Sequence, residues 1–89
     1  MRQRVVLPQF ERDIARMKMR GKDVEKLIMV VALLCEQGRL PLRFRPHKLR
    51  GEYQGLWECH LESDWLLIYE LAEAHVLLHR TGTHADLFE

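Results

Sequence analysis

Apolar residues recur at helical spacing along the first part of the chain. A short extended segment over residues 2–7 precedes Pro8, a residue type that commonly opens a helix, and the helical spacing continues to Gly21. Asp23 can cap a second helix, and Gly38 can end it. The apolar stripe of this second helix comprises Val24, Leu27, Ile28, Val31, Leu34 and Cys35. The pattern therefore predicts one strand and then two helices that pack against a core.

Residues after position 55 follow the spacing of β-strands. Residues 56–61 alternate between apolar and polar, which places Glu58 and His60 on the face opposite the apolar one. Residues 65–71 are apolar at nearly every position, as in a central strand that is covered on both faces, and residues 75–80 form a further strand. We therefore expect a small α+β domain, with a mostly antiparallel sheet and the two N-terminal helices packed on one face.

The turn between the first two of these strands decides which side chains meet at the end of the sheet. A two-residue turn at Glu62-Ser63 sets His60 opposite Trp65. A three-residue turn at Leu61-Glu62-Ser63 brings His60 level with Asp64 instead. Both registers leave Asp64 within a few residues of His60, so we expect its carboxylate to orient that imidazole or to raise its pKa.

Composition fits one ordinary globular domain over residues 1–89. The hydrophobic fraction of 47% and the charged fraction of 30% exclude a disordered chain, and 89 residues suffice for one small core. The longest apolar run, residues 27–35, is much shorter than the ~20 residues of a membrane span, and the N-terminus has no signal-peptide core. Cys35 and Cys59 lack the spacing of a disulfide framework or a zinc site, which favours packing roles. We therefore expect a reduced, cytoplasmic protein with no membrane partner.

Charge is divided unequally along the chain. Residues 1–50 carry 13 Lys or Arg and 5 Asp or Glu, a net charge of +8, whereas residues 51–89 carry 1 and 8, a net charge of −7. Five basic residues form an acid-free stretch around two prolines: Arg39, Arg43, Arg45, Lys48 and Arg50. Such a stretch suits phosphate contacts made through a loop, and a solvated basic surface is the alternative.

Ionisable side chains gather at the ends of the predicted strands. His60 and Asp64 bracket one turn, and Arg80 and His84 close the last strand. Histidine can give or take a proton near neutral pH, and an arginine beside it favours an anion. Acid–base chemistry on a phosphate is the function that this grouping predicts.

Metal-free cleavage of RNA would use these groups directly. It needs a base for the proton of the 2′-hydroxyl, an acid for the leaving 5′-oxygen and a cation for the charge that gathers on phosphorus. Imidazoles can supply the first two functions and a guanidinium the third, while an aromatic ring can stack on an unpaired base. The candidates for these roles are His47, His60, His84, Arg80, Trp65 and Phe88.

Ordinary structural roles are the alternative for each candidate. Arg80 could pair with Glu70 or Glu73 on the adjacent strand, and the two aromatic residues could belong to the core. A zinc site through His60 and Asp64 is a weaker alternative, because it needs a further ligand at a supporting spacing and only His84 or His47 is left to supply it. We interpret His75 and His79 as structural, since four residues of a strand span ~13 Å and no ion bridges them.

Four segments resemble the YafQ branch of the RelE/ParE toxin superfamily. They are residues 47–51, 58–60, 64–69 and 80–88. The match extends upstream through residues 20–23 and 26–27, so it covers nearly the whole chain. Two positions depart from the family pattern: Lys48 stands where a proline is common, and Leu56-Trp57 replaces an aromatic-basic pair.

The resemblance implies a bacterial type II toxin, a ribosome-dependent endoribonuclease that cuts mRNA in the ribosomal A site. It also implies a RelE-like sheet of four to five strands with the active site on its concave side. The expected partners are a cognate antitoxin, the 70S ribosome with its mRNA, and operator DNA only as the toxin–antitoxin complex; we expect no cofactor. The family's site residues fall on His47, His60, Asp64, His84, Arg80 and Phe88, to which we add Trp65, Lys48 and Arg50 as substrate contacts.

A catalytically silent homologue is the alternative to a nuclease. Such a protein would act only as a binding module, for example as a corepressor together with its antitoxin. A binding module has no need for an intact set of catalytic side chains, which argues for the nuclease. That set is His47, His60, Asp64 and His84.

Overall fold

The computed structural model describes residues 1–88. It contains two helices at the positions that the apolar spacing predicted. Helix α1 spans Pro8–Met19 and helix α2 spans Val24–Gln37. The side chain of Asp23 accepts the backbone N–H of Glu25 at 3.0 Å, which caps α2, and Gly38 ends the helix in a left-handed conformation with φ 69°. The predicted start and end of α2 are therefore confirmed.

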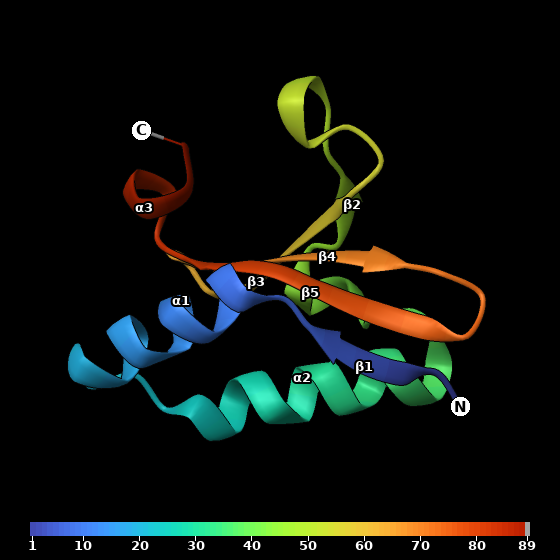
Figure 1. The fold of residues 1–89 in the computed structure, drawn as a ribbon, viewed down its shortest axis with the longest axis horizontal. Helices are drawn as coiled ribbons and strands as arrows, with labels where there is room; N and C mark the ends of the chain where they lie inside the picture. Colours follow the sequence, from blue (N-terminus) through green and yellow to red (C-terminus); the bar gives the residue numbers. More distant parts are fainter. Residues whose placement is uncertain (89) are drawn as a thin grey trace.

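Five strands form one mixed sheet in the order β1-β5-β4-β3-β2 (Figure 1). The strands are β1 Gln3–Val6, β2 His47–Lys48, β3 Trp57–Glu62, β4 Trp65–Leu71 and β5 His75–Gly82. Strand β1 runs parallel to β5, and every other pair is antiparallel. The α+β class, the mostly antiparallel sheet and the central position of β4 are confirmed. The parallel pairing of β1 is a feature that the sequence did not predict.

The sheet separates two layers of unequal size (Figure 1). Helices α1 and α2 cover one face, whereas the short helix α3, His84–Phe88, and the connection from β2 to β3 rise on the other side. Two short 3₁₀-helices lie in the segment between α2 and β3, at Leu42–Phe44 and Gly51–Tyr53. Within residues 1–88, no helix is long and apolar enough to cross a membrane.

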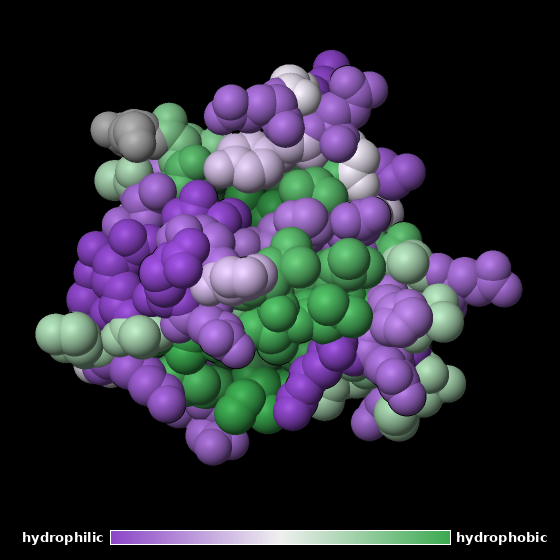
Figure 2. All heavy atoms as spheres, in the orientation of Figure 1, coloured by the Kyte–Doolittle hydropathy of each residue, from purple (hydrophilic) through white to green (hydrophobic). Residues whose placement is uncertain are grey.

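Part of the helical layer stays uncovered. Figure 2 shows apolar side chains at the surface around β1, α1 and α2. A shallow hollow between these elements is lined by Val6, Ile14, Val24 and Ile28. Ile28 is 46% exposed, although the predicted stripe placed it in the core. Leu27, Val31 and Leu34 of that stripe are buried as predicted, and the buried face of α2 extends to Val30, which is 1% exposed.

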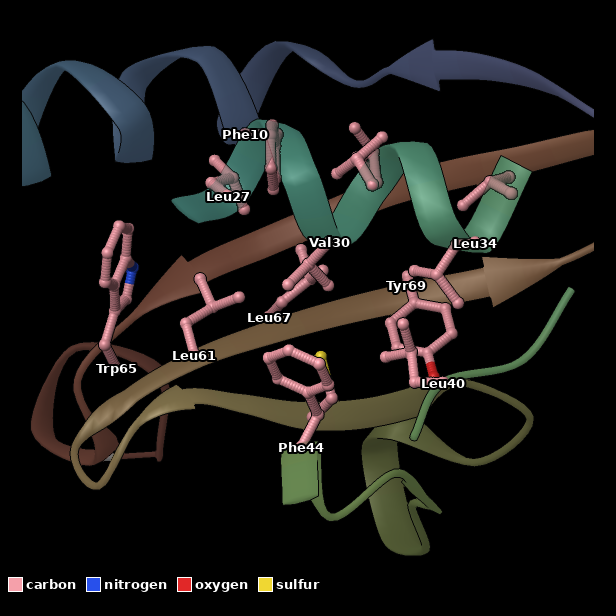
Figure 3. Close-up of a cluster of buried hydrophobic side chains, with 14 of the residues drawn as sticks. Phe10, Leu27, Val30, Leu34, Leu40, Phe44, Leu61, Trp65, Leu67 and Tyr69 are labelled. Atoms are coloured by element: carbon pink, nitrogen blue, oxygen red, sulfur yellow. The ribbon is translucent and has the colours of Figure 1, made fainter. Parts of the chain in front are cut away.

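The main core lies between the two long helices and the sheet. Phe10 of α1 and Val30 of α2 project toward Leu67 and Tyr69 of the central strand (Figure 3). Burial of a large apolar side chain contributes about 1.5–3 kcal/mol, so this layer anchors both helices to β4.

A second, smaller apolar cluster covers the other face of β4. Leu66 and Ile68 are fully buried there against Leu87 of α3. Three partly buried residues complete the cluster: Leu49, Tyr53 and Leu56. Tyr53 also donates its hydroxyl hydrogen to the carbonyl oxygen of Leu87 at 3.1 Å. This cluster fastens α3 to the sheet and explains why β4 is apolar at nearly every position.

An extra residue in β3 gives the β3–β4 hairpin a register that differs from both predicted ones. His60 pairs with Leu66 and Glu62 pairs with Trp65, with a bulge between His60 and Glu62. The turn therefore consists of Ser63-Asp64. Both predicted registers are wrong, because a bulge adds one residue to one strand and alternation does not reveal such an insertion.

Candidate active site

Three histidines and one phenylalanine form a row on the face opposite α1 and α2. The ring centroids of His47 and His60 are 6.4 Å apart, and those of His60 and His84 are 6.1 Å apart. The ring of Phe88 follows at 6.2 Å from that of His84. Strand β2 carries the first ring, β3 the second and α3 the last two. The fold therefore brings together three imidazoles that are far apart in the sequence.

Asp64 holds His84 through two hydrogen bonds. Its Oδ1 atom accepts the backbone N–H of His84 at 2.9 Å and the ring Nδ1–H at 2.7 Å. The backbone hydrogen bond, followed by the ring hydrogen bond, lowers the pKa of Asp64, which favours the ionised carboxylate. Because a carboxylate only accepts, Nδ1 carries the proton and Nε2 is left to face a ligand. Asp64 thus orients His84 and not the predicted His60, since the bulged hairpin aims it at α3.

Glu58 lies buried between the other two histidines. Its side chain is 7% exposed, and its Oε1 atom is 3.3 Å from Nε2 of His47 and 3.6 Å from Nε2 of His60. On the far side of the ring, Nδ1 of His47 donates to the carbonyl oxygen of Arg45 at 3.1 Å. Alternation placed Glu58 on the face of His60 but gave it no role. Its cross-strand pairing with His47 is visible only in the structure.

Arg80 is held by a buried carboxylate from α1. Its Nε and Nη2 atoms donate to Asp13, to Oδ2 at 2.7 Å and to Oδ1 at 3.3 Å. Asp13 is fully buried and also accepts the backbone N–H of Thr81 at 3.1 Å. Glu70, an alternative partner considered for Arg80, pairs with His79 at 3.0 Å instead. The sequence gave no sign that Asp13 holds Arg80, because Arg80 and Thr81 lie 67 and 68 positions away.

The two aromatic residues predicted to contact substrate differ in exposure. Trp65 is fully buried, and its Nε1 donates to Oγ1 of Thr81 at 2.9 Å. Trp65 therefore belongs to the core, out of reach of a base, as the structural alternative held. Phe88 is 43% exposed and packs edge-on against Tyr53 with ring centroids 5.5 Å apart. Its ring is open to a ligand at the end of the histidine row.

Part of the predicted basic stretch lies beside the histidine row. All five of its residues are exposed: Arg39, Arg43, Arg45, Lys48 and Arg50. A shallow hollow has Arg43 and Arg45 on one side and His60 on the other. The Nζ atom of Lys48 lies 5.7 Å from the centre of the Trp57 ring, which packs against the main core, so this cation lies on the face of the sheet opposite His47. The positive charge that borders the imidazoles therefore comes from Arg43 and Arg45 beside His60, and it suits a phosphate backbone.

The described residues offer neither a metal cage nor a reactive thiol. Residues 1–88 contain no group of three or more His, Cys, Asp or Glu side chains placed to hold a metal ion. Cys59 is buried, and burial raises the pKa of its thiol to about 12. Cys35 is a free thiol that packs against the main core. The predicted packing roles of both cysteines are confirmed.

The arrangement is suited to moving protons on a bound anion. One imidazole is oriented with a free Nε2, two more lie beside a buried carboxylate, and exposed cations border His60. These are the groups that displacement at a phosphodiester requires.

The chain is similar in sequence and in fold to a family of bacterial toxins. Residues 2–89 match the family model described as a bacterial toxin of type II toxin-antitoxin system, YafQ. The mRNA interferase toxin YafQ of Escherichia coli strain K12 is 38% identical over 81 residues, which cover 90% of this chain and 88% of that relative. The crystal structure of YafQ from E. coli strain BL21(DE3) matches with a TM-score of 0.93 and 34% identity over 100% of both chains. The toxin in the crystal structure of the E. coli DinJ–YafQ complex matches with a TM-score of 0.91 and 36% identity, again over 100% of both chains.

Proposed function

The chain belongs to the YafQ family of bacterial toxins from type II toxin–antitoxin systems, and from that premise we propose that it is an endoribonuclease that cleaves mRNA in the ribosomal A site. The proposed reaction is a metal-independent attack of the 2′-hydroxyl on phosphorus. The observation that carries the proposal is the His84 ring, oriented by Asp64 and 6.1 Å from the ring of His60. Two imidazoles at this separation can both reach oxygens of one phosphodiester.

The proposed chemistry divides the proton transfers between imidazoles. One imidazole takes the proton of the 2′-hydroxyl as its oxygen attacks phosphorus, and another gives a proton to the leaving 5′-oxygen. The products are a 2′,3′-cyclic phosphate and a free 5′-hydroxyl. Arg80 and the basic stretch stabilise the charge that gathers on phosphorus, while Phe88 stacks on a base.

Ribosome dependence follows from the openness of this site. The Asp64 and His84 side chains are 61% and 53% exposed, and the hollow beside His60 is shallow. Such a surface binds RNA but does little to hold it in the in-line geometry that attack requires. A ribosome that fixes the message in the A site supplies that geometry.

Mapping of mRNA 5′ ends tests the activity. Ribosomes programmed with a defined mRNA are incubated with the protein, and we expect new 5′ ends at the A-site codon, with little cleavage of the same RNA when free. A 2′-deoxy substitution at the cut site should block the reaction, and chelators that leave the ribosome intact should not. Intact message on ribosomes would identify a catalytically silent binding module. Equal cleavage of free RNA would overturn the ribosome dependence.

A cognate antitoxin is the proposed protein partner, by analogy with the DinJ–YafQ complex of the E. coli relative. An antitoxin that binds only the folded toxin stabilises it by about 2.7 kcal/mol at 100 times its Kd. We expect a higher melting temperature and loss of cleavage on complex formation, and binding to operator DNA only by the complex. A partner that leaves cleavage untouched at saturation would contradict neutralisation.

A further inference from the structure

Glu58 is a buried carboxylate whose surroundings differ from those of the other buried acids. Asp13 accepts hydrogen bonds from Arg80 and from a backbone N–H. Asp86 likewise accepts from Arg20 and from a backbone N–H. Within residues 1–88, the groups found in ion-pair range of Glu58 are His47 and His60 alone. Its charge thus faces two titratable imidazoles and no permanent cation.

Burial of this charge is not explained by stability. Removing a carboxylate from water costs free energy that a fixed cation or several hydrogen bonds normally offset. Glu58 lies 3.3 Å from His47 and 3.6 Å from His60, and the second distance exceeds that of a hydrogen bond. A neutral glutamine of the same shape would avoid the desolvation cost. The retained carboxylate therefore points to a role in the reaction.

The two histidines gain a defined proton arrangement from Glu58. Nδ1 of His47 donates to a backbone carbonyl, and its Nε2 faces the carboxylate, so both ring nitrogens face groups that only accept. His60 turns Nε2 toward the same oxygen, while its buried Nδ1 has no hydrogen-bond partner. Cross-strand pairing of His47 with Glu58 fixes this geometry.

We propose that Glu58 is a positioning residue of the cleavage reaction, which holds the rings of His47 and His60 in place with their Nε2 atoms directed at one carboxylate oxygen. The inference rests on the proposed endoribonuclease function. The proton that moves in the reaction travels between an imidazole and an oxygen of the RNA. Glu58 contacts the imidazoles and not the RNA, so the bonds that form and break on the RNA are those given above.

Substitution by glutamine isolates the charge. Glu58→Gln should lower the rate of mRNA cleavage at saturating ribosomes by about 10- to 100-fold, the order expected for a group that orients a catalytic histidine, with the ribosome concentration for half-maximal rate unchanged. The melting temperature should stay equal or rise, because a buried charge is lost. Glu58→Asp, which restores the charge on a shorter side chain, should recover part of the rate.

A second carboxylate–histidine pair on the same sheet provides the matched control. Glu70 lies 3.0 Å from Nε2 of His79, outside the histidine row. Glu70→Gln should therefore leave cleavage at the wild-type rate. In ¹⁵N spectra of the imidazole rings, Glu58→Gln should change the signals of His47 and His60 and leave that of His84 in place.

The other outcomes contradict either the positioning role of Glu58 or the proposed function. A folded Glu58→Gln protein that cleaves at the wild-type rate overturns the positioning role. So does a variant whose loss of rate follows a large fall in melting temperature, since that result assigns Glu58 to the fold. If the wild-type protein cleaves nothing on ribosomes, the proposed function fails by itself. The ring signals of His47 and His60 then still decide whether Glu58 sets their proton arrangement.

Discussion

Side chains in the site differ in how firmly their partners hold them. Arg80 donates to the fully buried Asp13, so water does not compete for those hydrogen bonds. The hydrogen bond from His84 to Asp64 lies between two exposed side chains and does face that competition. The site therefore combines a rigid cation with an imidazole that can adjust its position.

Alanine at the histidine row should lower the rate of cleavage. His60→Ala and His84→Ala should each slow mRNA cleavage on programmed ribosomes by about 10²- to 10⁴-fold, because an acid or base contributes that much. Asp64→Ala should also slow it, since Nδ1 of His84 loses its acceptor. His75 and His79 lie outside the row, so the His75→Ala and His79→Ala variants should cleave at the wild-type rate. Folded variants of His60 and His84 with wild-type rates would show that the catalytic assignment is wrong.

Trp65→Phe distinguishes a core residue from a substrate contact. The change keeps an aromatic ring but removes the donor to Thr81, at a cost of about 1–3 kcal/mol in the free energy of unfolding. We expect a lower denaturant midpoint and an unchanged cleavage rate per folded molecule. If the variant has wild-type stability but cleaves slowly, Trp65 contacts the substrate after all.

The chemistry-bearing residues were predictable from the sequence, and the residues that support them were not. His60, Asp64 and His84 stand out because their types and their places at strand ends suit proton transfer. Asp13 and Glu58 resemble ordinary exposed acids, since one sits on an amphipathic helix and the other on an alternating strand. Only the tertiary contacts reveal that both are buried.

Helix α3 carries the imidazole of His84 but has too few residues to be stable alone. Thr83 and Asp86 cap it reciprocally: the N–H of Thr83 donates to Oδ2 of Asp86 at 2.9 Å, and the N–H of Asp86 donates to Oγ1 of Thr83 at 3.1 Å. Asp86 also accepts from Nη1 of Arg20 at 2.6 Å. The placement of the His84 ring therefore depends on a contact with the end of α1.

Asp86→Asn should destabilise the protein in a pH-dependent way. The hydrogen bond from Arg20, as the main cause, holds the pKa of Asp86 well below its ordinary range. A carboxylate with a lowered pKa stabilises the fold above its unfolded pKa of about 3.9, and that contribution is lost as the pH falls through the folded value. At pH 7 we expect a melting temperature lower by about 4–8 °C, which corresponds to ~1 kcal/mol.

Melting curves at several pH values check the sign of this effect. The difference between wild type and Asp86→Asn should be constant near neutrality and should narrow steadily as the pH falls below about 4. If the difference in melting temperature is the same at pH 7 and pH 2, the charge of Asp86 does not cause the stabilisation.

Local patterns predicted the long elements, whereas pairings over long distances escaped prediction. The ends of α2 follow from Asp23 and Gly38, which act on their immediate neighbours. The parallel pairing of β1 with β5 joins Gln3 to His75, and no short-range pattern encodes it. The bulge after His60 likewise depends on how β3 meets β4. The missed bulge changed the expected partner of Asp64.

The two oppositely charged halves of the sequence neutralise each other over only part of the molecule. Lys22 and Lys26 both pair with Glu62, at 2.7 Å and 2.8 Å. Arg20 pairs with Asp86. Within residues 1–88, the ion pairs do not include any of the five cations of the basic stretch. That uncompensated charge is available to an anionic partner.

Neutralising the basic stretch should change how ribosome binding depends on salt. The triple substitution of Arg43, Arg45 and Lys48 by glutamine should weaken binding and flatten the slope of log K against log salt by ~2–3, since each phosphate contact contributes about 0.7–0.9. Filter binding at several salt concentrations measures the slope.

The matched control places the same three substitutions on the helical side of the molecule. The exposed residues for this control are Arg4, Arg12 and Lys18. Their variant should bind with the wild-type slope. If the slope is unchanged in the variant of Arg43, Arg45 and Lys48, the basic stretch is a solvated surface that does not contact phosphates.

The pairing of β1 with β5 sets an order of events during synthesis of the chain. The partner of Gln3 is His75, so a ribosome must add 72 further residues before β1 has a strand to join. At ~5–20 residues per second this takes roughly 4–14 s. Throughout that time Asp13 on α1 lacks Arg80 and Thr81, its partners in the finished fold. The sheet and the anchor of Arg80 therefore form only after nearly the whole described chain has been made.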